Sequence, residues 1–128
     1  MKFDIDKLAD LLELQNHLKG VDIAAFENDW AMRCMAERAL QVMVEIVIDI
    51  AERIIAIEGA GPAATSGEAF DKLVRLGVIE STEPYKNMIR FRNLIVHEYE
   101  EVDPQIVYNI ATKQIDAFRM FRDEIDKL

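Results

Sequence analysis

Residues 37–58, ERALQVMVEIVIDIAERIIAIE, carry the strongest pattern in the sequence. Apolar residues recur every three or four positions, which is the spacing of one helical face: Leu40, Met43, Val47, Ile50, Ile54 and Ile57. Further valines and isoleucines at positions 42, 44, 46 and 48 leave only one narrow polar stripe: Glu37, Gln41, Glu45, Asp49 and Arg53. A helix that is apolar on nearly every side is buried on nearly every side. We therefore expect this helix to pack within its own bundle and also against a second copy of the chain.

The segments before and just after this helix are predicted to be helical as well. Helical spacing of apolar residues predicts a helix over residues 4–19, which Gly20 ends. Asp22 is placed to cap the long helix, which we expect to run to about residue 58. Residues 59–66 begin with Gly-Ala-Gly-Pro and predict a loop, followed by a short helix that ends at Gly77. We expect three apolar residues of this short helix to face inward: Phe70, Leu73 and Leu76.

The last third of the chain predicts two more helices. Ser81 or Thr82 caps the first, which has Pro84 in its first turn and runs into Arg92. Its inner face consists of Met88, Ile89 and Phe91. Asp103, followed by a proline, caps a last helix that nearly reaches the end of the sequence. The inward stripe of this last helix is Val107, Ile110, Ala111, Ile115, Phe118, Phe121 and Ile125.

The sequence contains no alternating strand pattern and no internal repeat. It therefore predicts an all-α protein, an up-and-down bundle of four to five helices that forms a dimer. The chain has 128 residues, 51% hydrophobic and 30% charged, with only 5 glycines and 3 prolines. This composition excludes a disordered protein and fits a single domain over residues 1–128.

The composition also restricts the location and the partners of the protein. Cys34 is the single cysteine, so no internal disulfide can form, and we expect its thiol to be buried among apolar neighbours. The first ten residues are interrupted by charges, unlike a signal peptide, and no apolar run is long enough to span a bilayer. We expect a soluble, cytoplasmic protein without a membrane partner. The net charge of −9 argues against a general nucleic-acid coat protein but leaves room for a local basic cleft.

Most motifs that carry chemistry are absent. No glycine-rich phosphate loop is present, and the two histidines, His17 and His97, are too far apart in sequence for a zinc motif. We expect His17 to be a solvated or a helix-capping histidine. Glu45 and Asp49 lie one helical turn apart, but without a histidine they more often pair with an arginine, such as Arg38 or Arg53, than bind a metal ion. The sequence thus predicts no metal and no cofactor.

Residues 84–103, PYKNMIRFRNLIVHEYEEVD, are the exception. Four cations or potential cations gather there: Lys86, Arg90, Arg92 and His97, with Tyr85 and Tyr99 on either side. An imidazole can take a proton from a ribose 2′-hydroxyl or give one to a leaving oxygen, and a guanidinium can hold the phosphate. The segment would therefore support phosphodiester cleavage without a metal. The alternative is structural, with the histidine packed near a bundle end and the arginines reaching solvent.

The string Arg92-Asn-Leu-Ile-Val-His97-Glu-Tyr99 resembles the Arg-x4-His-x-Tyr motif of the HEPN superfamily. More narrowly, the chain is similar to the HepT toxins of modules that pair a HEPN protein with a minimal nucleotidyltransferase (MNT) antitoxin. The likeness extends over nearly the whole chain and includes the patterns of residues 37–50, 70–79 and 102–103.

This resemblance implies a helical homodimer that acts as a metal-independent endoribonuclease, with its motif residues in a cleft between the subunits. Arg92 and His97 would be the catalytic pair, and Asn93 would hold the local geometry. Tyr99 would be the residue that the partner nucleotidyltransferase modifies with AMP, which inactivates the toxin. Other members of the superfamily suggest an alternative, a non-catalytic module that binds a nucleotide or a nucleotidyltransferase.

Helical geometry limits how the catalytic pair can meet. Five residues along an α-helix turn the side chain by about 140°, so Arg92 and His97 would point apart on an unbroken helix. We therefore expect that the helix ends or distorts after about Asn93, or that a second subunit supplies one of the two groups. A shared cleft would also collect the cations of Lys86 and Arg90 from two chains, which would allow an acidic protein to bind RNA.

Overall fold

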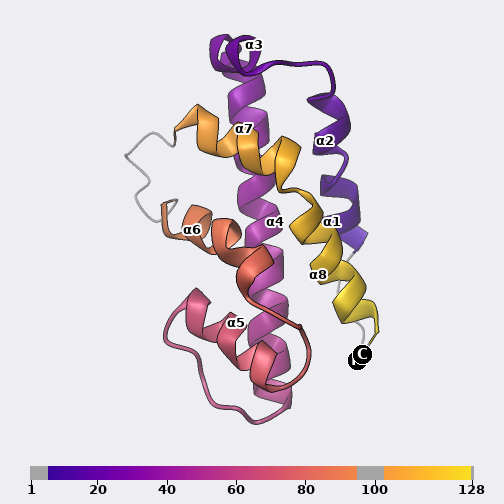
Figure 1. The fold of residues 1–128 in the computed structure, drawn as a ribbon, viewed down its shortest axis with the longest axis vertical. Helices are drawn as coiled ribbons and strands as arrows, with labels where there is room; N and C mark the ends of the chain where they lie inside the picture. Colours follow the sequence, from indigo (N-terminus) through magenta and orange to yellow (C-terminus); the bar gives the residue numbers. More distant parts are fainter. Residues whose placement is uncertain (1–5, 95–102, 128) are drawn as a thin grey trace.

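The computed structural model describes residues 6–94 and 103–127, and these ranges contain helices, turns and loops but no strand. The helix α4 (Trp30–Ile57) runs along the length of the molecule, and the others pack around it (Figure 1). These are α1 (Asp6–Leu11), α2 (Leu14–His17), α3 (Ile23–Asn28), α5 (Ser66–Arg75), the 3-10 turn η1 (Glu83–Tyr85), α6 (Lys86–Leu94), α7 (Pro104–Lys113) and α8 (Asp116–Asp126). The prediction of an all-α fold is confirmed for these residues.

Three of the five predicted helices are divided in two. The predicted helix over residues 4–19 breaks between α1 and α2, and the last helix breaks between α7 and α8. The predicted helix over residues 22–58 breaks at Asp29, which is extended at φ −107° and ψ 95°. The Asp29 carboxylate accepts a hydrogen bond of 3.0 Å from the Met32 backbone N–H, so this residue begins α4 as its N-cap. The boundary between α3 and α4 thus follows from the preference of aspartate for a cap over a helix interior.

The predicted caps at the other helix starts are confirmed where aspartate was expected. Asp22 accepts a hydrogen bond of 2.8 Å from the Ala25 N–H, and Asp103 accepts one of 2.9 Å from the Gln105 N–H. Thr82 precedes η1 without a side-chain cap, whereas the Ser81 hydroxyl accepts from the Glu83 N–H at 3.1 Å.

The core lies between α4 and the helices that cover it. Ten residues of α4 are buried: Ala36, Leu40, Met43, Val44, Val47, Ile48, Ile50, Ala51, Ile54 and Ile55. All seven residues of the predicted stripe over α7 and α8 are also buried. Two inward predictions are wrong, because Leu76 and Ile57 lie at the ends of α5 and α4, where 36% and 52% of their surfaces are exposed. These ten residues of α4 are therefore covered within one chain.

Within residues 6–94 and 103–127, none of the helices combines the length and the apolar character that crossing a bilayer requires.

Candidate functional site

In the cationic segment, residues 84–103, the described cations Lys86, Arg90 and Arg92 lie on α6, which packs against both α4 and α7. Arg92 is half-buried in its last turn, while Arg90 and Asn93 are exposed. Lys86 is also exposed, and its ammonium forms an ion pair of 2.8 Å with Glu83. His97 and Tyr99 lie outside the described residues, as does the predicted helix end or distortion after Asn93.

The side chains of α6 divide between two faces. Met88 and Phe91 are buried and form the inner face. Arg92 follows Phe91 and lies at the edge of this face. The outer face carries three exposed residues at intervals of four and three positions: Lys86, Arg90 and Asn93. Because each residue turns the helix by about 100°, Arg90 and Arg92 project about 160° apart. Arg92 is thus separated from the other α6 cations of its own chain.

Tyr85, which the sequence places beside these cations, belongs to the core instead. Its side chain has no exposed surface and stacks on Phe70, with ring centroids 5.1 Å apart, while Phe121 meets it edge-on at 5.8 Å. The Tyr85 hydroxyl donates a hydrogen bond of 2.8 Å to Glu124 Oε1 on α8. Burial raises the pKa of Tyr85 well above its usual range, and the Glu124 carboxylate raises it further. Tyr85 therefore fixes the start of α6 and does not face a substrate.

After residues 95–102 the chain continues into α7, and the start of this helix is held in place by side-chain contacts. Asp103 caps this helix, and the Gln105 side-chain amide donates a hydrogen bond of 3.5 Å to Glu27 on α3. α3 and α7 also pack against each other. Both helices that border residues 95–102 are thus anchored to the rest of the bundle.

The remaining candidate residues have structural roles. Arg53 Nε lies 3.0 Å from Asp49 Oδ2, so the predicted pairing with an arginine is confirmed for Asp49. Glu45 instead accepts a hydrogen bond of 3.3 Å from the Gln41 amide, so the same prediction is wrong for Glu45. No group of three or more His, Cys, Asp or Glu residues that could hold a metal ion occurs in the described ranges.

Predictions for the two remaining reactive side chains have opposite outcomes. His17 is exposed, as expected. Cys34 is also exposed, so the prediction of a buried thiol is wrong. The first turns of α4 present an outer face, on which Trp30 is 71% exposed and Met35 is 40% exposed. Apolar neighbours in sequence therefore do not cover the thiol.

Sequence reasoning missed the contact between Tyr85 and Glu124. The two residues are 39 positions apart, and a tyrosine followed much later by a glutamate has no recognisable spacing. The only available signal was that a large aromatic residue in a helical bundle is usually buried and needs a partner for its hydroxyl.

The comparisons with known proteins agree with one another. The family model described as Ribonuclease HepT-like matches residues 7–125. The mRNA nuclease HepT of Shewanella oneidensis is 27% identical over 125 residues, which cover 94% of each chain. The tRNA nuclease HepT of Aphanizomenon flos-aquae is 24% identical over 116 residues, which cover 87% of this chain and 79% of that protein.

Two solved structures share the fold. One is a crystal structure of a toxin–antitoxin with AMP-PNP, whose matching chain is 25% identical with a TM-score of 0.84 and coverage of 97% of this chain and 95% of that one. The other is a rebuilt and re-refined structure of the tri-AMPylated Shewanella oneidensis HEPN toxin in complex with MNT antitoxin. Its matching chain is 24% identical with a TM-score of 0.82, and the match covers 97% of this chain and 94% of that one.

Proposed function

Since the chain belongs to the HepT-like ribonuclease family, we propose that it is a metal-independent endoribonuclease and the toxin of a toxin–antitoxin module. The observation that carries this proposal is the string from Arg92 to Tyr99, which stands in a chain that the family model matches over residues 7–125. The nuclease descriptions of two relatives support the choice of RNA as substrate.

In the proposed reaction, the His97 imidazole takes the proton from a ribose 2′-hydroxyl. The 2′-oxygen then forms a bond to phosphorus while the bond from phosphorus to the 5′-oxygen breaks. The leaving 5′-oxygen receives a proton from the imidazolium form of His97. Arg92 holds the phosphate and stabilises the negative charge that builds up on its oxygens. The half-buried position of Arg92 supports this role, because packing at the edge of the core limits the directions its side chain can take.

We propose that the working form is a homodimer with the motif residues of both chains in one cleft. On a continuous helix His97 would point about 140° away from Arg92, and a second chain removes this obstacle. Asn93 is proposed to hold the local geometry. Arg90 is the better candidate for an additional phosphate contact, because Lys86 is already paired with Glu83 at 2.8 Å.

Regulation is proposed to follow from AMP addition to Tyr99 by an MNT antitoxin. The structural relative that is described as tri-AMPylated and in complex with MNT antitoxin supports this assignment. The other two tyrosines already use their hydroxyls, since Tyr85 donates to Glu124 and Tyr108 donates to the Val21 carbonyl at 2.6 Å. An adenylate on Tyr99 would add a bulky anion beside the cations and repel the substrate phosphate.

A cleavage assay tests the proposal. Unmodified protein, checked by intact mass, is incubated with cellular RNA in excess chelator beside the variants His97→Ala and Arg92→Ala. Arg75→Ala is the matched control, because Arg75 is an exposed arginine on α5, outside the cationic segment. We expect cleavage by the wild type and by Arg75→Ala, and at least a hundredfold loss in the two motif variants. Folded, unmodified dimer that leaves RNA intact would instead indicate the non-catalytic binding module.

A further inference from the structure

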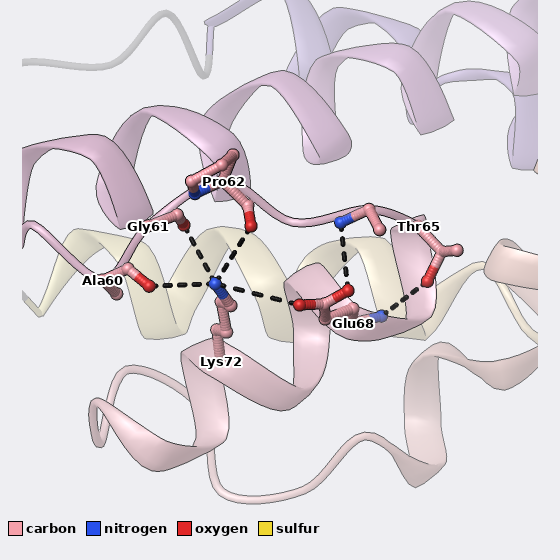
Figure 2. A network of polar contacts seen from close by, with 7 residues as sticks. Ala60, Gly61, Pro62, Thr65, Glu68 and Lys72 are labelled. Carbon is pink, nitrogen blue, oxygen red and sulfur yellow. Dashed lines mark hydrogen bonds and ion pairs between the residues drawn. The ribbon is translucent and has the colours of Figure 1, made fainter.

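The connection between α4 and α5 folds around the ammonium group of Lys72 (Figure 2). Lys72 Nζ lies 2.9 Å from the Ala60 carbonyl oxygen, 3.0 Å from that of Gly61 and 3.1 Å from that of Pro62. The Glu68 carboxylate oxygen Oε1 is 3.9 Å away, and only 14% of the Lys72 side chain is exposed. Three successive carbonyls and a carboxylate thus point at one positive charge.

The backbone of this loop is shaped to bring those carbonyls together. Gly59 and Gly61 have φ angles of +66° and +78°, in a region that side chains other than that of glycine rarely adopt. The far end of the loop is fixed separately. Glu68 Oε2 accepts a hydrogen bond of 3.0 Å from the Ala64 N–H, and the Thr65 hydroxyl accepts one of 3.1 Å from the Glu68 N–H.

The ligand set is that of a cation site. Small, hard cations are held by carbonyl and carboxylate oxygens, and an ammonium has three N–H donors, one for each of these carbonyls. Lys72 reaches this position from α5, ten to twelve residues after the oxygens that it contacts.

We propose that residues 60–62 together with Glu68 form a cage for a monovalent cation, which the chain fills with the ammonium of its own Lys72. The group acts as a latch that holds this loop against α5. The same loop forms one wall of an open pocket of about 630 Å³ beside the end of α4, lined by Glu52, Ile55, Ala56, Gly59, Gly61, Pro62 and Ala63. The latch therefore also keeps the shape of that pocket.

Two variants separate the charge of Lys72 from its packing. Lys72→Ala removes the ammonium and leaves space in the cage, whereas Lys72→Met keeps most of the side-chain volume without a donor. Thermal unfolding is measured in ammonium chloride and in tetramethylammonium chloride at equal ionic strength, because the second cation has no N–H group. Lys113→Ala, which removes an exposed lysine at the end of α7, is the matched control.

We expect the Tm of both Lys72 variants to fall by about 5 °C or more in tetramethylammonium chloride. Ammonium chloride should restore the Tm of Lys72→Ala progressively with concentration, as expected for a ligand that binds only the folded chain. Ammonium chloride should not restore the Tm of Lys72→Met. It should also leave the Tm of the wild type and of Lys113→Ala unchanged. Amide hydrogen exchange of residues 59–65 should accelerate in Lys72→Met, while the exchange of the α4 core stays slow.

Two results would overturn the proposal. One is a Lys72→Met protein with the Tm and the loop protection of the wild type, because the charge would then be dispensable. The other is a Lys72→Ala protein whose stability, or failure to fold, is the same in both salts. Neither result depends on ribonuclease activity, so the proposed function is tested separately.

Discussion

The Tyr85 hydroxyl and Glu124 Oε1 are 2.8 Å apart, although the two residues are separated by 39 positions in the sequence. Glu124 Oε2 also accepts a hydrogen bond of 3.2 Å from the Glu80 backbone N–H. One carboxylate on α8 therefore contacts both the connection between α5 and η1, at Glu80, and the end of η1, at Tyr85. The helix that carries Arg92 begins at the residue after Tyr85.

Removing this hydroxyl should destabilise the protein. Tyr85→Phe keeps the ring between Phe70 and Phe121 but loses the hydrogen bond to the carboxylate, and we expect the free energy of unfolding to fall by about 1–2 kcal/mol. Urea denaturation followed by circular dichroism measures this difference. Glu124→Gln is the matched control, because its amide oxygen can still accept from Tyr85, and its loss should be smaller. A Tyr85→Phe protein as stable as the wild type would show that the bond contributes nothing.

The raised pKa of Tyr85 predicts a loss of stability at alkaline pH. In the unfolded chain a tyrosine loses its proton near pH 10, whereas the buried Tyr85 keeps it to higher pH. The contribution of Tyr85 is therefore complete below about pH 10. Above that pH the unfolded state binds fewer protons, and the free energy of unfolding should fall by up to about 1.4 kcal/mol per pH unit.

Urea midpoints recorded at intervals from pH 8.5 to 11.5 test this slope. Tyr85→Phe should lose stability less steeply over the same range, because its phenyl ring has no proton to release. Parallel curves for the two proteins would show that Tyr85 ionises equally easily in the folded and unfolded states.

Local sequence signals predict the helical segments but not the positions at which one helix ends and the next begins. The stripe from Val107 to Ile125 is buried as predicted, because its apolar spacing is continuous across the break between α7 and α8. The boundary between α3 and α4 at Asp29 was not predicted, because an aspartate within a periodic segment can be either a surface residue or a cap. Hydrogen bonding of its side chain to the Met32 N–H decides between the two.

For the candidate site, too, the sequence predicted local features but not the contacts between distant residues. The sequence predicts that a helix with an apolar inner face runs into Arg92, and Arg92 lies in the last turn of α6. The burial of Tyr85 and the carbonyl cage around Lys72 depend on residues brought together by packing of α5 and α8 or by a loop of unusual backbone conformation. No spacing rule within a single helix describes such contacts.

Exposure of Cys34 predicts a thiol that reacts in the native protein. A thiol-specific reagent such as Ellman's reagent should modify one cysteine per chain without denaturant and as completely as in urea. Cys34→Ser provides the blank. A thiol that reacts only after unfolding would contradict this prediction and would indicate that another chain covers the start of α4.

Modification by the proposed nucleotidyltransferase partner should depend on Tyr99 alone. After co-expression with a nucleotidyltransferase encoded beside this protein, we expect intact mass to show AMP on the wild type and none on Tyr99→Phe. The hydroxyls of Tyr85 and Tyr108 are hydrogen-bonded within the fold, so they should stay unmodified. Tyr108→Phe is the matched control and should accept AMP like the wild type.

Because Tyr99→Phe removes the acceptor of AMP and leaves Arg92 and His97 in place, this variant should cleave RNA even in the presence of the nucleotidyltransferase and ATP. Equal AMP on the wild type and on Tyr99→Phe would move the regulatory site elsewhere without affecting the catalytic proposal.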